Sequence, residues 1–70
     1  MEPTAQFATN LRRLRLAAGL TQERLSEAAH MDSAEISRLE RGARDPQLLT
    51  IVRVARGLGV TPSELLSGVE

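Results

Sequence analysis

Glycine, proline and capping residues divide this chain into five short segments, and that division constrains the fold more than any other feature. Apolar residues inside the segments recur every three or four positions, as they do along one side of an α-helix. Alternating β-branched residues, which would indicate strands, are scarce, and the only aromatic residue is one phenylalanine. Because 70 residues fall below the usual size of one domain, the sequence predicts a single all-α domain over residues 1–70, with its core over 7–66.

The expected helix boundaries follow from the capping residues. Thr4 is expected to cap the first helix, and Asp32 is expected to form a capping box with Glu35 at the third. Pro46 fits the first position of the fourth helix, and His30 falls in a turn where a positive φ is expected. The predicted helical ranges are 4–18, 21–29, 33–41, 46–58 and 61–66.

Composition excludes several classes of protein. The chain has no cysteine and one histidine, His30, so disulfides, thiolate metal sites and multi-histidine zinc sites are excluded. No nucleophile–base set, carboxylate pair or phosphate-binding loop is recognisable, and we therefore expect no enzyme activity and no cofactor. No apolar run approaches roughly 18 residues, and no secretion signal opens the chain. These features favour a cytoplasmic binding module without a membrane segment or a small-molecule ligand.

Charge is balanced overall but is unevenly distributed. Nine basic residues, all of them arginine, offset nine acidic ones, and no arginine lies beyond Arg56. A neutral domain is unusual for a nucleic-acid-binding protein, yet the planar guanidinium group suits phosphate and guanine recognition. A GC-rich genome, which encodes arginine by default, would explain the same composition.

The third segment carries the pattern that points to a binding surface. It follows the second segment after only about three residues, a spacing typical of a helix-turn-helix. Ile36 and Leu39 form its apolar side, and the opposite side has only small side chains and arginines: Ser33, Ala34, Ser37, Arg38 and Arg41. Such a side fits closely into the major groove of DNA, where an arginine can pair with guanine O6 and N7. From these residues alone, a polar side that is merely solvated is the alternative.

Beyond these patterns, the chain resembles the XRE-type family, the phage-repressor and Cro-like helix-turn-helix domains. The resemblance covers about residues 7–66 in order and without gaps. The matching stretches are Asn10–Arg15, Gly19–Glu23, Ile36–Gly42, Pro46 and Leu58–Leu66. It implies a compact five-helix, repressor-like DNA-binding domain in which the second and third helices form the helix-turn-helix.

The resemblance also implies roles for individual residues. In such proteins the recognition helix places its first residues on base edges, and the preceding helix crosses the phosphate backbone. The implied base contacts are Ser33, Ala34, Glu35, Ser37 and Arg38, with Arg38 as the guanine reader. The implied phosphate contacts are Thr21, Gln22, Arg13, Arg41, Gly42 and Arg44. An ion pair between Arg15 and Glu40 is implied as a structural element, and both residues flank apolar stripes in the sequence.

The expected function is therefore sequence-specific binding of double-stranded DNA by a transcriptional regulator of the repressor type. One domain of this size covers only about half an operator, so we expect a homodimer on a pseudo-palindromic site. The candidate dimer interface consists of apolar residues left outside the core stripes: Leu49, Val52, Leu66 and Val69. Isolated exposed apolar residues are also ordinary on protein surfaces. The alternative function is a protein-interaction module, such as an antitoxin or the partner of a regulator.

Overall fold

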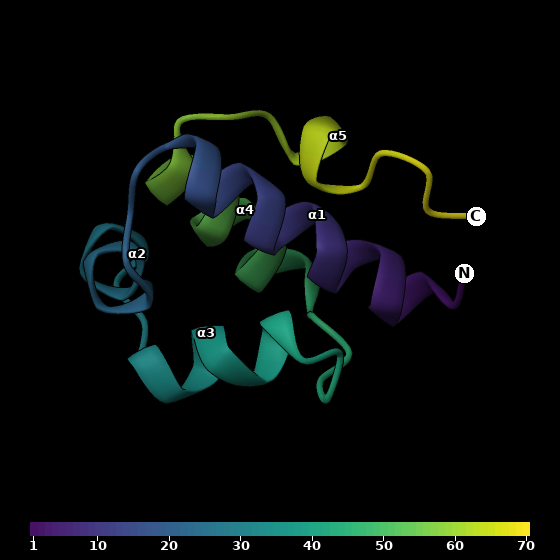
Figure 1. Ribbon diagram of the computed structural model, residues 1–70, viewed down its shortest axis with the longest axis horizontal. Coiled ribbons are helices and arrows are strands. Elements are labelled where there is room, and N and C mark those ends of the chain that lie inside the picture. Colours follow the sequence, from purple (N-terminus) through teal and green to yellow (C-terminus); the bar gives the residue numbers. More distant parts are fainter.

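The computed structural model describes all 70 residues and contains five helices and no strand (Figure 1). The predicted all-α fold is therefore confirmed. The helices are α1 (Pro3–Ala17), α2 (Gln22–Ala29), α3 (Ser33–Glu40), α4 (Leu48–Leu58) and α5 (Pro62–Leu65). None of them combines the length and the apolar character needed to cross a lipid bilayer.

One small core joins all five helices. In Figure 1, α1 passes in front of α4, with α3 below it and the short α5 above. Helix α2 packs against α3 and α4, while α5 packs against α1 and α4. The residues at the centre of the core are at most 2% exposed: Phe7, Leu11, Leu25, Ile36, Leu39, Val54 and Leu65. Each such side chain contributes roughly 1.5–3 kcal/mol through burial, so few substitutions in this core can be tolerated.

Two helix starts agree with the sequence prediction. The Thr21 hydroxyl accepts a hydrogen bond from the Arg24 backbone N–H at 3.0 Å and caps α2. Thr61 and Glu64 form a complete capping box at α5. His30 ends α2 with a φ of +56°, as expected from its place in the turn, and it is the only residue other than glycine with a positive φ.

The capping of α1 and α3 differs from the prediction, although α3 begins at Ser33 as expected. The first helix begins at Pro3 with Glu2 as its N-cap residue, so Thr4 does not cap it; proline suits the first turn because its φ is fixed and no N–H is lost there. Asp32 is the N-cap residue of α3, but its side chain makes no capping hydrogen bond. The expected capping box with Glu35 is absent because the Glu35 carboxylate lies beside two arginines instead.

The fourth helix also begins later than predicted. It starts at Leu48, with Gln47 as its N-cap residue, so Pro46 lies in the loop before the helix. As a result Leu48 is in the first turn of α4 and is 75% exposed, although its spacing from the core residues Ile51 and Ala55, three and seven positions later, is that of one helix side. The apolar surface at the start of α4 is larger than the sequence suggested.

Gly57 lies inside α4 and is not a helix-stop residue. A Cβ atom on it would lie 3.1 Å from the backbone nitrogen of Ala29 and 3.1 Å from a methyl carbon of Leu25, both in α2. Such distances are shorter than almost all contacts of real Cβ atoms. Glycine at this position therefore lets α2 approach α4 closely, and this contact fixes the place of the first helix of the helix-turn-helix.

Asn10 is a buried polar residue that attaches α5 to α1. Its side chain is 3% exposed, and its Nδ2 atom donates hydrogen bonds to the backbone oxygens of Leu65 at 2.8 Å and Ser67 at 2.7 Å. Its Oδ1 atom accepts a hydrogen bond from Gln6 Nε2 at 3.0 Å. A helix as short as α5 is not stable by itself, so these contacts and the burial of Leu65 hold it in place.

Candidate nucleic-acid interface

Helices α2 and α3 form the predicted helix-turn-helix, joined by His30, Met31 and Asp32. Ile36 and Leu39 are at most 1% exposed and fix the inner side of α3 to the core. Met31 in the turn packs against the same core. Helix α3 is therefore anchored to the core along its inner side, while its outer side lies at the surface of the domain.

The outer side of α3 carries the small residues that the sequence singled out. Ala34 and Arg41 are exposed, and Ser33 and Ser37 are partly exposed. Arg41 Nη1 donates a hydrogen bond to Ser37 Oγ at 2.5 Å. The first turn carries Ser33 and Ala34 on this side, with the Glu35 carboxylate beside them, so a neighbouring surface can come close to the helix backbone at the two small residues.

Glu35 and two arginines form a charged cluster next to this outer side. Glu35 Oε1 lies 3.4 Å from Nη1 of Arg38 and 3.9 Å from Nη2 of Arg44. Arg38 belongs to α3, whereas Arg44 belongs to the loop that follows it. Arg38, which is expected to read guanine, and Arg44, which is expected to contact phosphate, thus share the Glu35 carboxylate within the domain.

Arg15 and Glu40 are joined in a buried ion pair that connects α1 to the end of α3. Arg15 Nε donates to Glu40 Oε2 at 2.5 Å, and Arg15 Nη2 donates to Oε1 at 3.0 Å. The side chains are only 8% and 3% exposed. Hydrogen bonding to Glu40 and the charge of that carboxylate raise the pKa of Arg15, and burial acts in the opposite direction. The arginine is therefore charged throughout the neutral range.

The same network holds the first residue of α2. Gln22 is partly buried, and its Nε2 atom donates a hydrogen bond to Glu40 Oε1 at 3.2 Å. Arg15 Nη1 in turn donates to the backbone oxygen of Leu20 at 2.8 Å. The start of α2, where Thr21 and Gln22 were expected to contact phosphate, is thereby fixed relative to both α1 and α3.

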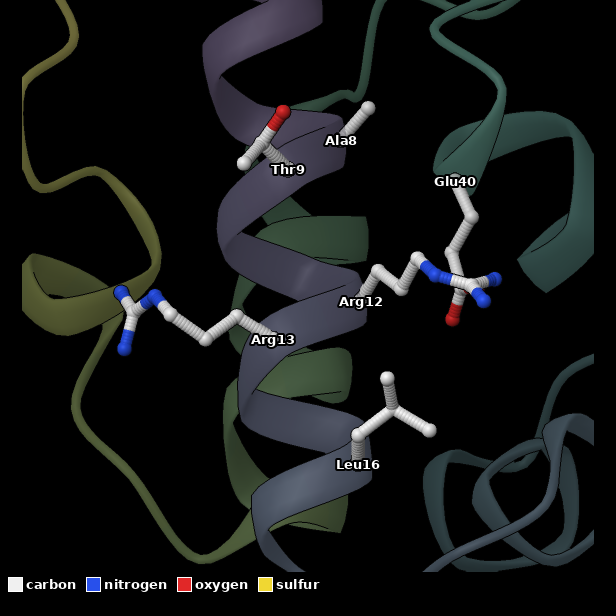
Figure 2. Close-up of a pocket in the computed structure, with 6 residues that line it drawn as sticks. All are labelled: Ala8, Thr9, Arg12, Arg13, Leu16 and Glu40. Atoms are coloured by element: carbon white, nitrogen blue, oxygen red, sulfur yellow. The ribbon is translucent and has the colours of Figure 1, made fainter.

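Arg12 and Arg13 point to opposite sides of α1 (Figure 2). Arg12 extends toward the end of α3, where its Nη1 atom lies 3.9 Å from Glu40 Oε1, and its side chain is 62% exposed. Arg13 extends toward α5. Arg12, which was not among the expected phosphate contacts, therefore lies beside the recognition helix, whereas the expected Arg13 lies on the other side of α1. The signal was present, since Arg12 lies three positions before Arg15 and so shares a helix side with it.

Gly42 shapes the loop after α3 instead of offering a free backbone donor. Its N–H already donates to the backbone oxygen of Leu39 at 3.2 Å, and the next N–H, of Ala43, donates to Arg38 at 3.0 Å. Its φ is +69°, so the chain turns there and runs against the start of α1. The loop presents the exposed side chains of Arg41 and Arg44 to solvent.

The predicted dimer residues lie on α4 and the C-terminal tail. Leu49 is 68% exposed and Leu66 is 37% exposed, whereas Val52 and Val69 are partly buried. Leu66 and Val69 line a small cavity of about 130 Å³ between the tail, α1 and the start of α4. Leu48, the neighbour of Leu49 at the start of α4, is 75% exposed.

Comparisons with known proteins agree with this geometry. A family model described as "Helix-turn-helix domain" matches residues 6–67. The chain is 39% identical over 67 residues to the HTH-type transcriptional regulator y4dJ of Sinorhizobium fredii, covering 96% of this chain and 87% of that protein. It is 34% identical over 61 residues to the control protein C.BamHI of Bacillus amyloliquefaciens, covering 86% and 75% of the two chains. The crystal structure of the restriction-modification controller protein C.AhdI from Aeromonas hydrophila matches with a TM-score of 0.86 at 37% identity, covering 89% of this chain and 94% of that one.

This chain belongs to the helix-turn-helix family. The family and the repressor-like five-helix fold expected from the sequence are both confirmed. Its relatives are transcriptional regulators and controller proteins of restriction-modification systems.

Proposed function

We propose that this protein is a transcriptional regulator that binds double-stranded DNA with α3 in the major groove. The observation that carries the proposal is the outer side of α3, which bears small residues and arginines and is left uncovered while Ile36 and Leu39 anchor its inner side. A rigid helix of this kind can place side chains on base edges. The functions of the relatives support the same conclusion. Because the proposed partner is double-stranded DNA, the proposed place of action is the cytoplasm.

Within this proposal the contacts divide into two groups. Base contacts come from the start and outer side of α3, with Arg38 reading guanine: Ser33, Ala34, Glu35, Ser37 and Arg38. Phosphate contacts surround them on α1, on α2 and in the loop after α3: Arg12, Thr21, Gln22, Arg41 and Arg44. The network of Gln22, Arg15 and Glu40 supports this division, because it fixes the backbone-contacting start of α2 relative to the base-contacting helix.

We propose that the protein binds its operator as a homodimer. A single small module buries roughly 600–1,000 Å² on DNA, and a net charge of zero provides little long-range attraction to it. Two domains related by a two-fold axis place their recognition helices about 34 Å apart, one turn of DNA. The longest dimension of the domain is 29 Å, which is compatible with that spacing. The apolar residues of α4 and the tail, with Leu48 added to the predicted set, are the surface proposed for this contact.

Selection of bound duplexes from a random pool, followed by binding titrations of variants, tests the proposal. We expect Arg38→Ala to weaken binding to the selected duplex by roughly 1–3 kcal/mol and to relax the preference at one base pair. Arg44→Ala should weaken binding to all sequences alike and reduce the salt dependence by about one phosphate contact. Arg56→Ala, which removes an exposed arginine of α4, is the control for charge alone. Equal losses on selected and random duplexes for both Arg38→Ala and Arg44→Ala would contradict the assigned roles.

The neutral net charge supports a second candidate, a protein-interaction module built on the same fold. A wild-type protein that shows no salt-sensitive retention of any duplex would favour this candidate, since DNA binding through phosphates is always salt-dependent.

A further inference from the structure

One carboxylate lies between two arginines to which different DNA contacts are assigned. Glu35 Oε1 is 3.4 Å from Arg38 and 3.9 Å from Arg44. The Glu35 side chain is 29% exposed, less than those of Arg38 at 42% and Arg44 at 51%. The carboxylate is therefore partly covered by two guanidinium groups. That of Arg38 is proposed to contact a base, and that of Arg44 is proposed to contact a DNA phosphate.

Stabilisation of the helix accounts for only part of this arrangement. Glu35 is in the first turn of α3, where a negative charge interacts favourably with the helix dipole, and Arg38 is its i+3 neighbour on the same helix. Arg44, however, lies outside the helix, in the following loop. Glu35 also does not form the capping hydrogen bond that its position would allow. The carboxylate is thus placed to hold both arginines and not only to support α3.

This arrangement affects binding because DNA competes for both arginines. When Arg38 moves to a guanine and Arg44 to a phosphate, Glu35 loses both partners on a surface facing a highly charged polyanion. A carboxylate in the major groove is compensated when a base offers an amino donor, such as cytosine N4. Without such a base the charge is desolvated and unpaired, and that is unfavourable.

We propose that Glu35 is a specificity-determining residue that suppresses binding to arbitrary DNA. It retains Arg38 and Arg44 in the cluster unless the duplex provides a guanine for Arg38 next to a base with an exocyclic amino group for Glu35. This inference rests on the proposed DNA-binding function and adds to it the residue that disfavours the wrong sequences.

The test compares Glu35→Gln with Glu27→Gln. The first change removes the charge and keeps the size of the side chain. The second removes a glutamate that also pairs with an arginine three residues away, in the reverse order, because Glu27 Oε1 lies 3.7 Å from Nη1 of Arg24 on α2. Each protein is titrated, at several salt concentrations, with the duplex that the wild type selects from a random pool and with a random-sequence duplex of equal length. Thermal unfolding of each protein is recorded in parallel.

We expect Glu35→Gln to bind the random duplex about tenfold more tightly and the selected duplex with little or no gain, so that the ratio of the two affinities falls about tenfold. Selection repeated with Glu35→Gln should lose the base preference beside the guanine. Glu27→Gln should leave the ratio at the wild-type value. Glu35→Asp, which keeps the charge, should still bind the random duplex weakly.

An unchanged ratio in Glu35→Gln, an equal change in Glu27→Gln, or tight binding of the random duplex by Glu35→Asp would each overturn the inference while leaving DNA binding in place. A wild-type protein that selects no duplex would overturn the proposed function itself, and this inference with it. That failure is visible before any variant is measured, so the two can be told apart.

Discussion

Replacing Glu40 with alanine should destabilise the domain more than it alters the sequences that the domain binds. The substitution removes both hydrogen bonds from Arg15 and the one from Gln22. It leaves the guanidinium of Arg15 buried without a counter-charge, and its side chain is only 8% exposed. Glu40→Ala also removes the hydrogen bonds and the charge that raise the pKa of Arg15, but the ordinary pKa of an arginine lies so far above neutrality that the guanidinium keeps its proton.

The magnitude follows from this burial. Removing one partner of a buried ion pair costs roughly 3–5 kcal/mol, whereas a domain of this length has a total stability of about 3.5–10 kcal/mol. Each kcal/mol shifts the Tm of a domain this small by roughly 4–8 °C. We therefore expect the Tm of Glu40→Ala to fall by at least about 12 °C, or the protein to be partly unfolded at room temperature.

Thermal and urea unfolding followed by circular dichroism measure this effect. Glu27→Ala is the matched control, because it removes a glutamate from an exposed pair with Arg24 that is worth at most about 1 kcal/mol. Replacing both buried partners, as Arg15→Met with Glu40→Leu, should restore most of the stability, since no charge is then left unpaired. The stability difference between wild type and Glu40→Ala should be the same at pH 7 and pH 9. A group whose pKa is raised by folding contributes its full stabilisation at every pH below its unfolded-state pKa, and for arginine that pKa lies far above neutrality. A Tm within about 2 °C of the parent, or equal to that of Glu27→Ala, would refute the reasoning.

Three further substitutions test the scaffold and the proposed dimer. Asn10→Ala should cost about 1–3 kcal/mol in urea unfolding, because the backbone oxygens of Leu65 and Ser67 lose their donor; no change would show that water replaces the amide. Gly57→Ala should lower stability by about 1–3 kcal/mol, although alanine favours helices, because the new methyl group meets α2; a gain in stability would contradict the close packing of α2 on α4. Leu49→Glu should shift the protein toward monomers in sedimentation across a range of concentrations, because an exposed leucine of the proposed interface becomes charged; an unchanged distribution would remove α4 from that interface.

Much of the fold could be predicted because its signals act over a few residues. Thr21 and Thr61 cap the helices that follow them, since a hydroxyl reaches a backbone N–H only three residues away. The spacing of Ile36 and Leu39 placed one side of α3 in the core and its small residues outside. These properties depend on the chain near each residue and hardly on what packs against it.

Positions where a distant part of the chain decides the environment could not be predicted in this way. Asn10 was overlooked because the carbonyl groups that it binds lie more than 50 residues further along. The reason for a glycine at position 57, inside the predicted fourth helix, is visible only when α2 is placed against it. Arg12 shares a helix side with Arg15 in the sequence, but the packing of α1 against α3 is needed to show that this side, and not that of Arg13, faces the end of the recognition helix.

The helical class, the boundaries of most helices and the residues on the outer side of α3 can be predicted from the sequence. The Arg15–Glu40 pair was implied by the family resemblance, and Glu35 and Arg38 are neighbours on one helix. The contact of Glu35 with Arg44 and the exposure of Leu48 at the start of α4 depend on the tertiary structure. The physical reason is the distance along the chain over which each interaction acts. Capping and hydrophobic periodicity act within one or two helical turns, whereas a charge pair between a helix and another part of the chain depends on how these parts pack.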